Sequence, residues 1–287
     1  MISTARTEPT CHLSHEDVMR TVHTIPPLPP SVVQLNALFS DPDYEITDVI
    51  RSVELDPALT GRLLHLANSA SRCPGGVGSI RAAVVSLGGG VVKSVAMAQC
   101  VRPQVDLDLS AFRMTPASYW RHSLTVVCFA EELAAQGVAE FGNDFSVAAI
   151  LHDFGKIVLT AHLTPDHHSL LHRADLGISA SDLERALLSI DHAEVSAVVA
   201  LRWELPEHLV RSIQHHHRPR MFDHPLCHGL NIANQLAWRL ESSDDGQRSE
   251  TIDRCLSTEA LRLSQDKLKE VYKHGAVRLQ QTLESYT

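Results

Sequence analysis

The sequence lacks several features that define common protein classes. Its six cysteines form no CxxC pair, so we expect neither a zinc ribbon nor a disulfide framework, and the thiols are predicted to be reduced. The longest apolar runs, such as VAAIL and LTVVCFA, are too short to span a bilayer, and the first residues lack the order of a signal peptide. These absences predict a globular protein of the cytoplasm with no membrane partner.

Positive charge is also scarce. The formal net charge is −9, whereas binding to nucleic acid depends on a basic face that releases counterions from phosphates, so no direct nucleic-acid partner is expected. The triplet Gly88, Gly89 and Gly90 lacks the spacing of a phosphate-binding loop, and no GxSxG elbow appears. These observations exclude a P-loop nucleotide site and an α/β-hydrolase site.

Apolar residues recur at helical spacing almost everywhere, and no segment shows sustained period-two alternation. In DPALTGRLLHLANSA, Leu59, Leu63 and Ala67 share one face, with Asp56 as N-cap and Pro57 as first helical residue. The pattern predicts one helix over residues 145–163, and two helices separated by the glycine triplet over residues 79–101. With 44% apolar residues for a core, we expect an all-α protein.

Two breaks in composition, residues 101–112 and residues 241–251, divide this helical pattern. They predict an N-terminal helical bundle over residues 1–105 and a second helical bundle over residues 112–241. Beyond them, residues 252–287 contain an amphipathic helix that is expected to pack on the core through Leu261, Leu268, Val271, Tyr272 and Leu279.

Histidine is abundant, and thirteen of the eighteen histidines lie between Tyr119 and Leu230. In LHDFGK, His152 and Asp153 directly follow the apolar run VAAIL, where ionisable groups are costly unless a partner compensates them. Imidazoles and a carboxylate that converge from several helices suit a divalent transition metal. A hydrogen-bonded core histidine without metal is the alternative for each one. The other histidines at helix ends or on apolar helices are His122, His192, His215, His216 and His217.

LHDFGK, with WRHS thirty residues upstream, resembles the HD superfamily of metal-dependent phosphohydrolases. IPPLPPSVVQL, DPALTGRLLHLANSA and SIRAAVVSLGG resemble the N-terminal half of the HDOD family, and ERALLSIDHAEVSAVVALRWELPEHLVRSIQHHHRP resembles its second half. The resemblance covers residues 22–220. It implies that the second predicted bundle is of the HD type.

The resemblance also implies a site. In HD hydrolases such ligands hold one or more metal ions, here iron, manganese or zinc, which activate water against a phosphoester. Asp153 would then be a catalytic residue as well as a bridging ligand, and Lys156 would meet a phosphate, unless it is an exposed lysine at a helix end. The positions that match metal ligands of HD hydrolases are His122, His152, Asp153 and His192, and His216 with His217 match the paired histidines of the related HD-GYP group.

Two positions depart from the pattern. Asn234 stands where the superfamily has a late aspartate, and an amide is a weaker ligand. RPRMFDHP follows His217 without the GYP signature by which the HD-GYP group acts on cyclic dinucleotides, which argues against hydrolysis of cyclic di-GMP. The resemblance leaves two functions. The first is a regulatory signal-transduction module with a protein partner, and the second is a metal-dependent phosphohydrolase or phosphodiesterase acting on a nucleotide or another phosphoester.

Overall fold

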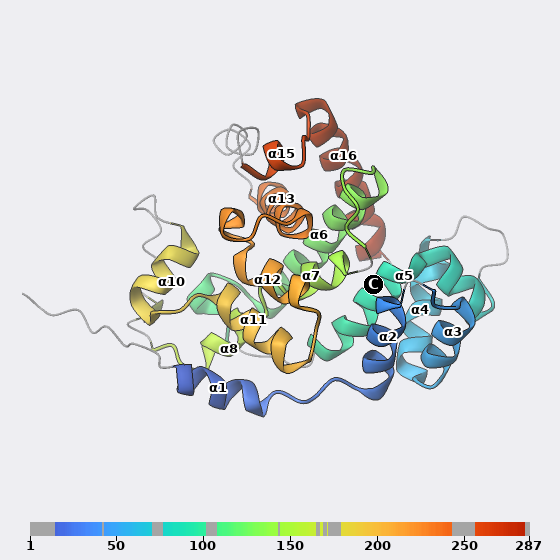
Figure 1. The fold of residues 1–287 in the computed structure, drawn as a ribbon, viewed down its shortest axis with the longest axis horizontal. Helices are drawn as coiled ribbons and strands as arrows, with labels where there is room; N and C mark the ends of the chain where they lie inside the picture. Colours follow the sequence, from blue (N-terminus) through green and yellow to red (C-terminus); the bar gives the residue numbers. More distant parts are fainter. Residues whose placement is uncertain are drawn as a thin grey trace, which may run out of the picture.

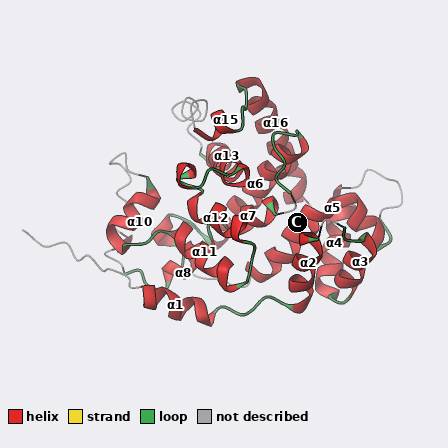
Figure 2. Cartoon of the chain, viewed as in Figure 1, coloured by secondary structure: helices red, strands yellow, loops and turns green. Residues whose placement is uncertain are grey.

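The chain folds into helices joined by turns and loops. The computed structural model describes residues 15–41, 43–70, 77–101, 108–142, 144–164, 167–168, 171, 179–242 and 256–284. Within these ranges no strand occurs (Figures 1 and 2). The prediction of an all-α protein is confirmed.

Four helices of the N-terminal part pack together at one end of the molecule (Figure 1). They are α2 (Pro30–Ser40), α3 (Ile46–Glu54), α4 (Pro57–Ala70) and α5 (Ile80–Val101). As predicted, Asp56 caps α4, because its carboxylate accepts hydrogen bonds from the backbone N–H groups of Ala58 and Leu59. α1 (His15–Thr24) lies apart from this group and packs on α8 (Phe154–Thr160) and α11 (His192–Arg202).

α5 is divided as the glycine triplet predicted. Gly88 has φ 79° and ψ 162°, a conformation open almost only to glycine, so the helix is kinked there. By length and composition α5 could cross a membrane, but half of its most apolar window is buried within the protein. It packs against α4 and α7 (Phe145–Leu151), as a core helix does.

Most of the helices between α5 and the C-terminal part lie around α7 and α11, near the centre of the molecule (Figure 1). The prediction of a single helix over residues 145–163 is wrong, because α7 ends at Leu151 and α8 begins at Phe154. The other elements here are η2 (Ser110–Phe112), α6 (Pro116–Ala135), α10 (Ala180–Leu188), α12 (Glu207–His215), η4 (Pro219–Met221) and α13 (Pro225–Glu241).

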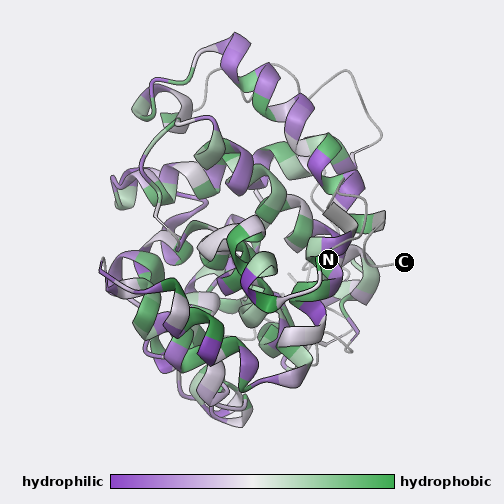
Figure 3. Ribbon diagram, turned by 90° about the vertical axis from the view of Figure 1, so that its right-hand side faces the viewer, coloured by the Kyte–Doolittle hydropathy of each residue, from purple (hydrophilic) through white to green (hydrophobic). Residues whose placement is uncertain are grey.

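The C-terminal part contributes α15 (Leu256–Ala260) and α16 (Gln265–Glu284). α16 packs along α6 and also contacts α4. Its buried side is formed by Leu268, Val271 and Leu279, while polar residues cover its other faces, and Figure 3 shows this mixed hydropathy along the helices. The boundaries predicted near residues 105 and 252 lie outside the described residues, so the division into domains stays a prediction.

Candidate metal centre

The break between α7 and α8 is where the His152–Asp153 doublet lies. Ser196 of α11 holds this corner, because its Oγ donates to the carbonyl of His152 at 2.9 Å and accepts from the N–H of Gly155 at 2.7 Å. A Cβ on Gly155 would lie 2.0 Å from the carbonyl oxygen of His192. Glycine therefore lets α8 start directly against α11, and the doublet faces that helix.

Two further helix ends point at the same place. α11 begins at His192, and its N-cap Asp191 accepts a hydrogen bond from the N–H of Glu194 at 2.9 Å. α12 ends at His215, so His216 and His217 continue the chain beyond it. Asn231 of α13 donates to the carbonyl of His216 at 2.7 Å and holds that end in place.

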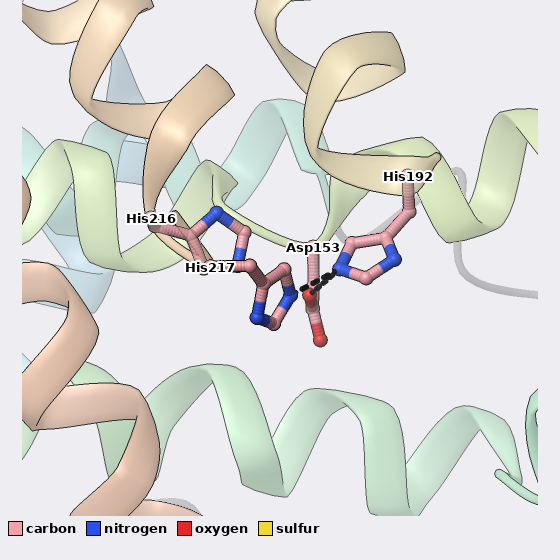
Figure 4. Close-up of side chains that lie close together, drawn as sticks. All are labelled: Asp153, His192, His216 and His217. Carbon is pink, nitrogen blue, oxygen red and sulfur yellow. Dashed lines mark hydrogen bonds and ion pairs between the residues drawn. The ribbon is translucent and has the colours of Figure 1, made fainter. Parts of the chain in front are cut away.

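The predicted ligands converge into two groups that share one carboxylate. Asp153, His192, His216 and His217 come from three separate elements, and one ligand atom of each lies within 4.8 Å of the others (Figure 4). His122, His152 and Asp153 form the second group by the same measure. The structure thus brings all six predicted ligand residues together. His215, partly buried, belongs to neither group.

Two imidazoles present nitrogens that have no hydrogen-bond partner among the described residues. His152 Nδ1 donates to the carbonyl of Ala149 at 2.8 Å, and His216 Nδ1 donates to that of Ile213 at 2.7 Å. These bonds leave Nε2 of each ring as an acceptor, and both Nε2 atoms are buried without a partner. An unpaired buried acceptor is costly, and a metal ion is the partner that neutral imidazole suits best. The donor set therefore fits a divalent transition metal.

Glu184 orients His192, a role that was not predicted from the sequence. Its buried carboxylate accepts from both the backbone N–H and Nδ1 of His192, at 2.8 Å and 2.6 Å. Nε2 of His192 then lies 3.1 Å from Asp153 Oδ1 and 2.9 Å from His217 Nε2. A carboxylate behind a histidine is the usual support of a metal ligand. The available signal was position, since Glu184 shares the apolar face of α10 with Leu187 and Leu188.

Burial and neighbouring charges shift the pKa values of the cluster residues in different directions. Burial lowers the pKa of His152 to about 4 and that of His216 to about 3, so both rings are neutral at physiological pH. Burial alone would raise the pKa of Asp153, but His152, Lys156 and His192 hold it well below its ordinary value. Burial alone would lower the pKa of His192, but Glu184 and Asp153 raise it to about 9.

Lys156 is part of this buried cluster. Its side chain is only 7% exposed, its ammonium lies 2.6 Å from Asp153 Oδ2, and the Trp238 ring centre lies 5.6 Å away. The alternative of an exposed lysine at a helix end is therefore wrong. Asp153 consequently turns one oxygen toward His192 and the other toward Lys156. The catalytic role expected for Asp153 and Lys156 stays a prediction.

His122 occupies the other side of the cluster. Its Nε2 lies 3.1 Å from Asn234 Oδ1, and its Nδ1 lies 2.9 Å from Glu241 Oε2. Its ring packs on Trp238 with centres 4.6 Å apart. Asn234 thus faces the same cluster as His122 and Asp153. Trp238 and Glu241 were not predicted, although their spacing from Asn234, four and seven residues, places all three on one face of α13.

The chain matches the HDOD domain over residues 25–219, which is two thirds of its length. It belongs to the HDOD domain family. All six predicted ligands of this HDOD protein lie within the matched residues, whereas Asn234, Trp238 and Glu241 lie beyond them. The departure at Asn234 is thus outside the part that defines the family.

The chain is also similar to proteins of other organisms. An uncharacterized protein of Treponema pallidum (strain Nichols) is 27% identical over 207 residues, or 68% of this chain, and the chain spans only 38% of that protein. An HDOD domain protein of unknown function from Geobacter sulfurreducens superposes with a TM-score of 0.71 at 20% identity, covering 95% of this chain and 98% of that one.

Two further solved structures share the fold. An assumed phosphohydrolase from Shewanella amazonensis SB2B gives a TM-score of 0.67 at 24% identity, covering 94% and 98% of the two chains. An assumed signal transduction protein from Marinobacter aquaeolei VT8 gives 0.70 at 22% identity, covering 94% of this chain and 64% of that one. At these identities the matches establish the fold of the HDOD protein alone.

Proposed function

We propose that this HDOD protein is a regulatory module of signal transduction in the cytoplasm that holds one divalent transition metal ion. Iron, manganese or zinc would be held by Asp153, His192, His216 and His217, with His152 beside them. The observation that carries the proposal is the pair of buried Nε2 atoms, on His152 and His216, without a hydrogen-bond partner. Polar atoms of this kind are rare in native cores unless a ligand pairs with them.

One ion rather than two is proposed because two of the three residues of the second group, His122 and Asp153, already have partners. Asp153 Oδ2 is paired with Lys156, and His122 Nε2 is within hydrogen-bond distance of Asn234. A second divalent ion would have to displace the Lys156 ammonium from a buried carboxylate. It would also meet an amide where a carboxylate would add negative charge.

A regulatory role is favoured over turnover because the cluster is closed. His122, His152, Asp153, His192 and His216 are all at most 1% exposed. A phosphoester substrate would need to reach Asp153 through that packing. A structural or regulatory ion has no such requirement, and a protein partner would act on the outer surface of the helices that carry the ligands.

The second candidate is a metal-dependent phosphohydrolase or phosphodiesterase for a nucleotide or another phosphoester. One specific observation favours it. His217 is partly exposed, so a phosphate would approach the cluster from the side on which His217 lies. A bound divalent ion would supply positive charge to polarise a phosphoryl oxygen. Lys156 would add a fixed cation next to Asp153, and Glu184 would keep the His192 ring in place.

Metal content tests the first proposal. The wild-type protein, purified without chelators or an affinity tag, is expected to carry about one equivalent of metal by inductively coupled plasma mass spectrometry. His152→Ala and Asp153→Ala are expected to lose it. His215→Ala is the matched control, because His215 adjoins the cluster but contributes no atom to either group. Wild-type protein without metal, or equal loss in the control, would contradict the proposal.

A phosphoester screen separates the two candidates. For a regulatory module, metal-loaded wild-type protein is expected to hydrolyse bis(p-nitrophenyl) phosphate and nucleotides no faster than Asp153→Ala. Turnover that disappears in both Asp153→Ala and Lys156→Met would favour the enzyme. Circular dichroism of each variant checks that the helices are retained.

A further inference from the structure

A partly buried ion pair joins the N-terminal helices to the helices that carry the candidate metal ligands. Lys93 of α5 is 1% exposed, and its ammonium pairs with Asp144, the residue that precedes α7. Asp144 Oδ2 also lies 2.9 Å from Nε2 of His208, the second residue of α12. A buried ammonium is costly without a partner, so this pair constrains where α5, α7 and α12 meet.

The position of the pair along the chain relates it to the site. Asp144 precedes His152 by eight residues, and His208 precedes His216 by eight residues. Both intervening segments are mainly helical, so each spans about 12 Å. The pair therefore fixes the starts of two helices whose far ends carry ligands of the cluster. α5 packs along α7 beside this point (Figure 1).

The packing around Asp144 leaves little freedom for α7 to move independently. All seven residues of α7 are buried, and its first residue, Phe145, contacts Phe141 with ring centres 4.2 Å apart. Both rings close on Gly229 of α13, where a Cβ would lie 2.6 Å from Phe141 and 2.8 Å from Phe145. A displacement of α5 at Lys93 would thus move α7 as a rigid unit, because tightly packed elements shift together.

We propose that Lys93 is a positioning residue for the metal site. Through Asp144 and His208 it sets how α7 and α12 are placed, and so the separation between the doublet and His216. Metal affinity would then depend on the N-terminal helices, and metal binding would in turn stabilise the contact at Lys93, since such coupling is reciprocal. This inference rests on the proposed metal binding and adds a route by which a partner on the N-terminal helices would regulate it.

Metal affinity in a double-mutant cycle tests this role. The dissociation constant of Mn²⁺ is measured by equilibrium dialysis for the wild type, Lys93→Met, Asp144→Asn and the double variant. We expect each single variant to bind Mn²⁺ about tenfold more weakly, and the double variant to lose less than the sum, because interacting residues are not additive. Leu63→Ala is the control, because it removes a fully buried side chain of α4 and destabilises the same part of the protein.

Each outcome decides the question. A loss of threefold or more in Lys93→Met and in Asp144→Asn, without loss in Leu63→Ala, supports the positioning role. A change below threefold, or an equal loss in Leu63→Ala, means that the pair only neutralises a buried lysine. Wild-type protein that binds no Mn²⁺ would overturn the proposed metal site itself. This result differs from a failure of the positioning role, in which the wild type still binds Mn²⁺.

A second readout does not depend on affinity. Saturating Mn²⁺ is expected to slow hydrogen exchange of the α5 amides near Lys93 in the wild type and in Leu63→Ala, but not in the double variant. Exchange in α5 that ignores Mn²⁺ in the wild type would overturn the coupling even if affinities changed.

Discussion

Asn234 determines how much negative charge the cluster offers to a metal ion. Its amide oxygen lies 3.1 Å from His122 Nε2, at the place where a carboxylate would complete the second group. Because metal affinity depends on the charge of the ligands, Asn234→Asp is expected to tighten Mn²⁺ binding about tenfold or to add a second equivalent. Equilibrium dialysis measures both. Asn36→Asp on α2 is the control, and an unchanged Asn234→Asp would show that the amide already serves as well as a carboxylate.

Glu184 is expected to matter for affinity although it is not a ligand. Without its carboxylate, His192 loses the partner that fixes its ring and tautomer, and losses of about 10–100-fold in metal affinity are usual for such residues. Glu184→Ala is therefore expected to bind Mn²⁺ that much more weakly. Glu184→Gln, whose amide oxygen still accepts from Nδ1, should retain more. Glu207→Gln, on the exposed side of α12, is the control, and equal affinities for all three variants would contradict the role.

The candidate ligands could be selected from the sequence because each is a polar side chain at a helix end or on an apolar helix, and because their positions match a known ligand pattern. Their supports could not, because Glu184 and Glu241 reach the site only through the packing of α10 and α13. Sequence periodicity also joined α7 and α8 into one helix. It could not reveal that Gly155 meets the backbone of α11, which is a contact between residues far apart in the chain.

At the scale of the element, the contact between α8 and α11 determines where His152 and Asp153 lie. Gly155→Ala would place a Cβ 2.0 Å from the carbonyl of His192 and 2.8 Å from the N–H nitrogen of Ser196. Both are backbone atoms, so the two helices must separate, and overpacking of this kind costs about 1–3 kcal/mol or more. We expect urea unfolding to show that loss of stability together with loss of bound metal.

The control for this prediction is a glycine in an open helical position. A Cβ on Gly61 of α4 meets no atom within 4 Å, so Gly61→Ala should stabilise the protein by about 0.5–1 kcal/mol, as alanine does in helices. If both alanine variants were equally stable, the close approach of α8 to α11 would be no constraint on the doublet.

At the scale of the whole molecule, α16 is fastened to α6 by a charged contact that responds to pH. Arg278 of α16 pairs with Glu131 at 3.2 Å and with Glu132 at 3.5 Å. Burial raises the pKa of Glu131 from 4.5 to about 7, although Arg278 opposes that change. Between these values the folded protein holds a proton that the unfolded chain has released. The contribution of Glu131 to stability is therefore largest below pH 4.5 and is lost as the pH rises to about 7.

Glu131→Gln isolates this effect, because glutamine keeps the shape of the side chain but does not titrate. The free energy of unfolding in urea is compared for wild type and variant at pH 5 and pH 8. From pH 5 to pH 8 the free energy of unfolding of the variant is expected to rise by about 1–3 kcal/mol relative to that of the wild type, since one pKa unit corresponds to about 1.4 kcal/mol. All other groups titrate equally in both proteins and cancel in the comparison. A difference that is constant with pH would mean that Arg278 keeps Glu131 ionised throughout, and that α16 stays docked on α6 by an ordinary ion pair.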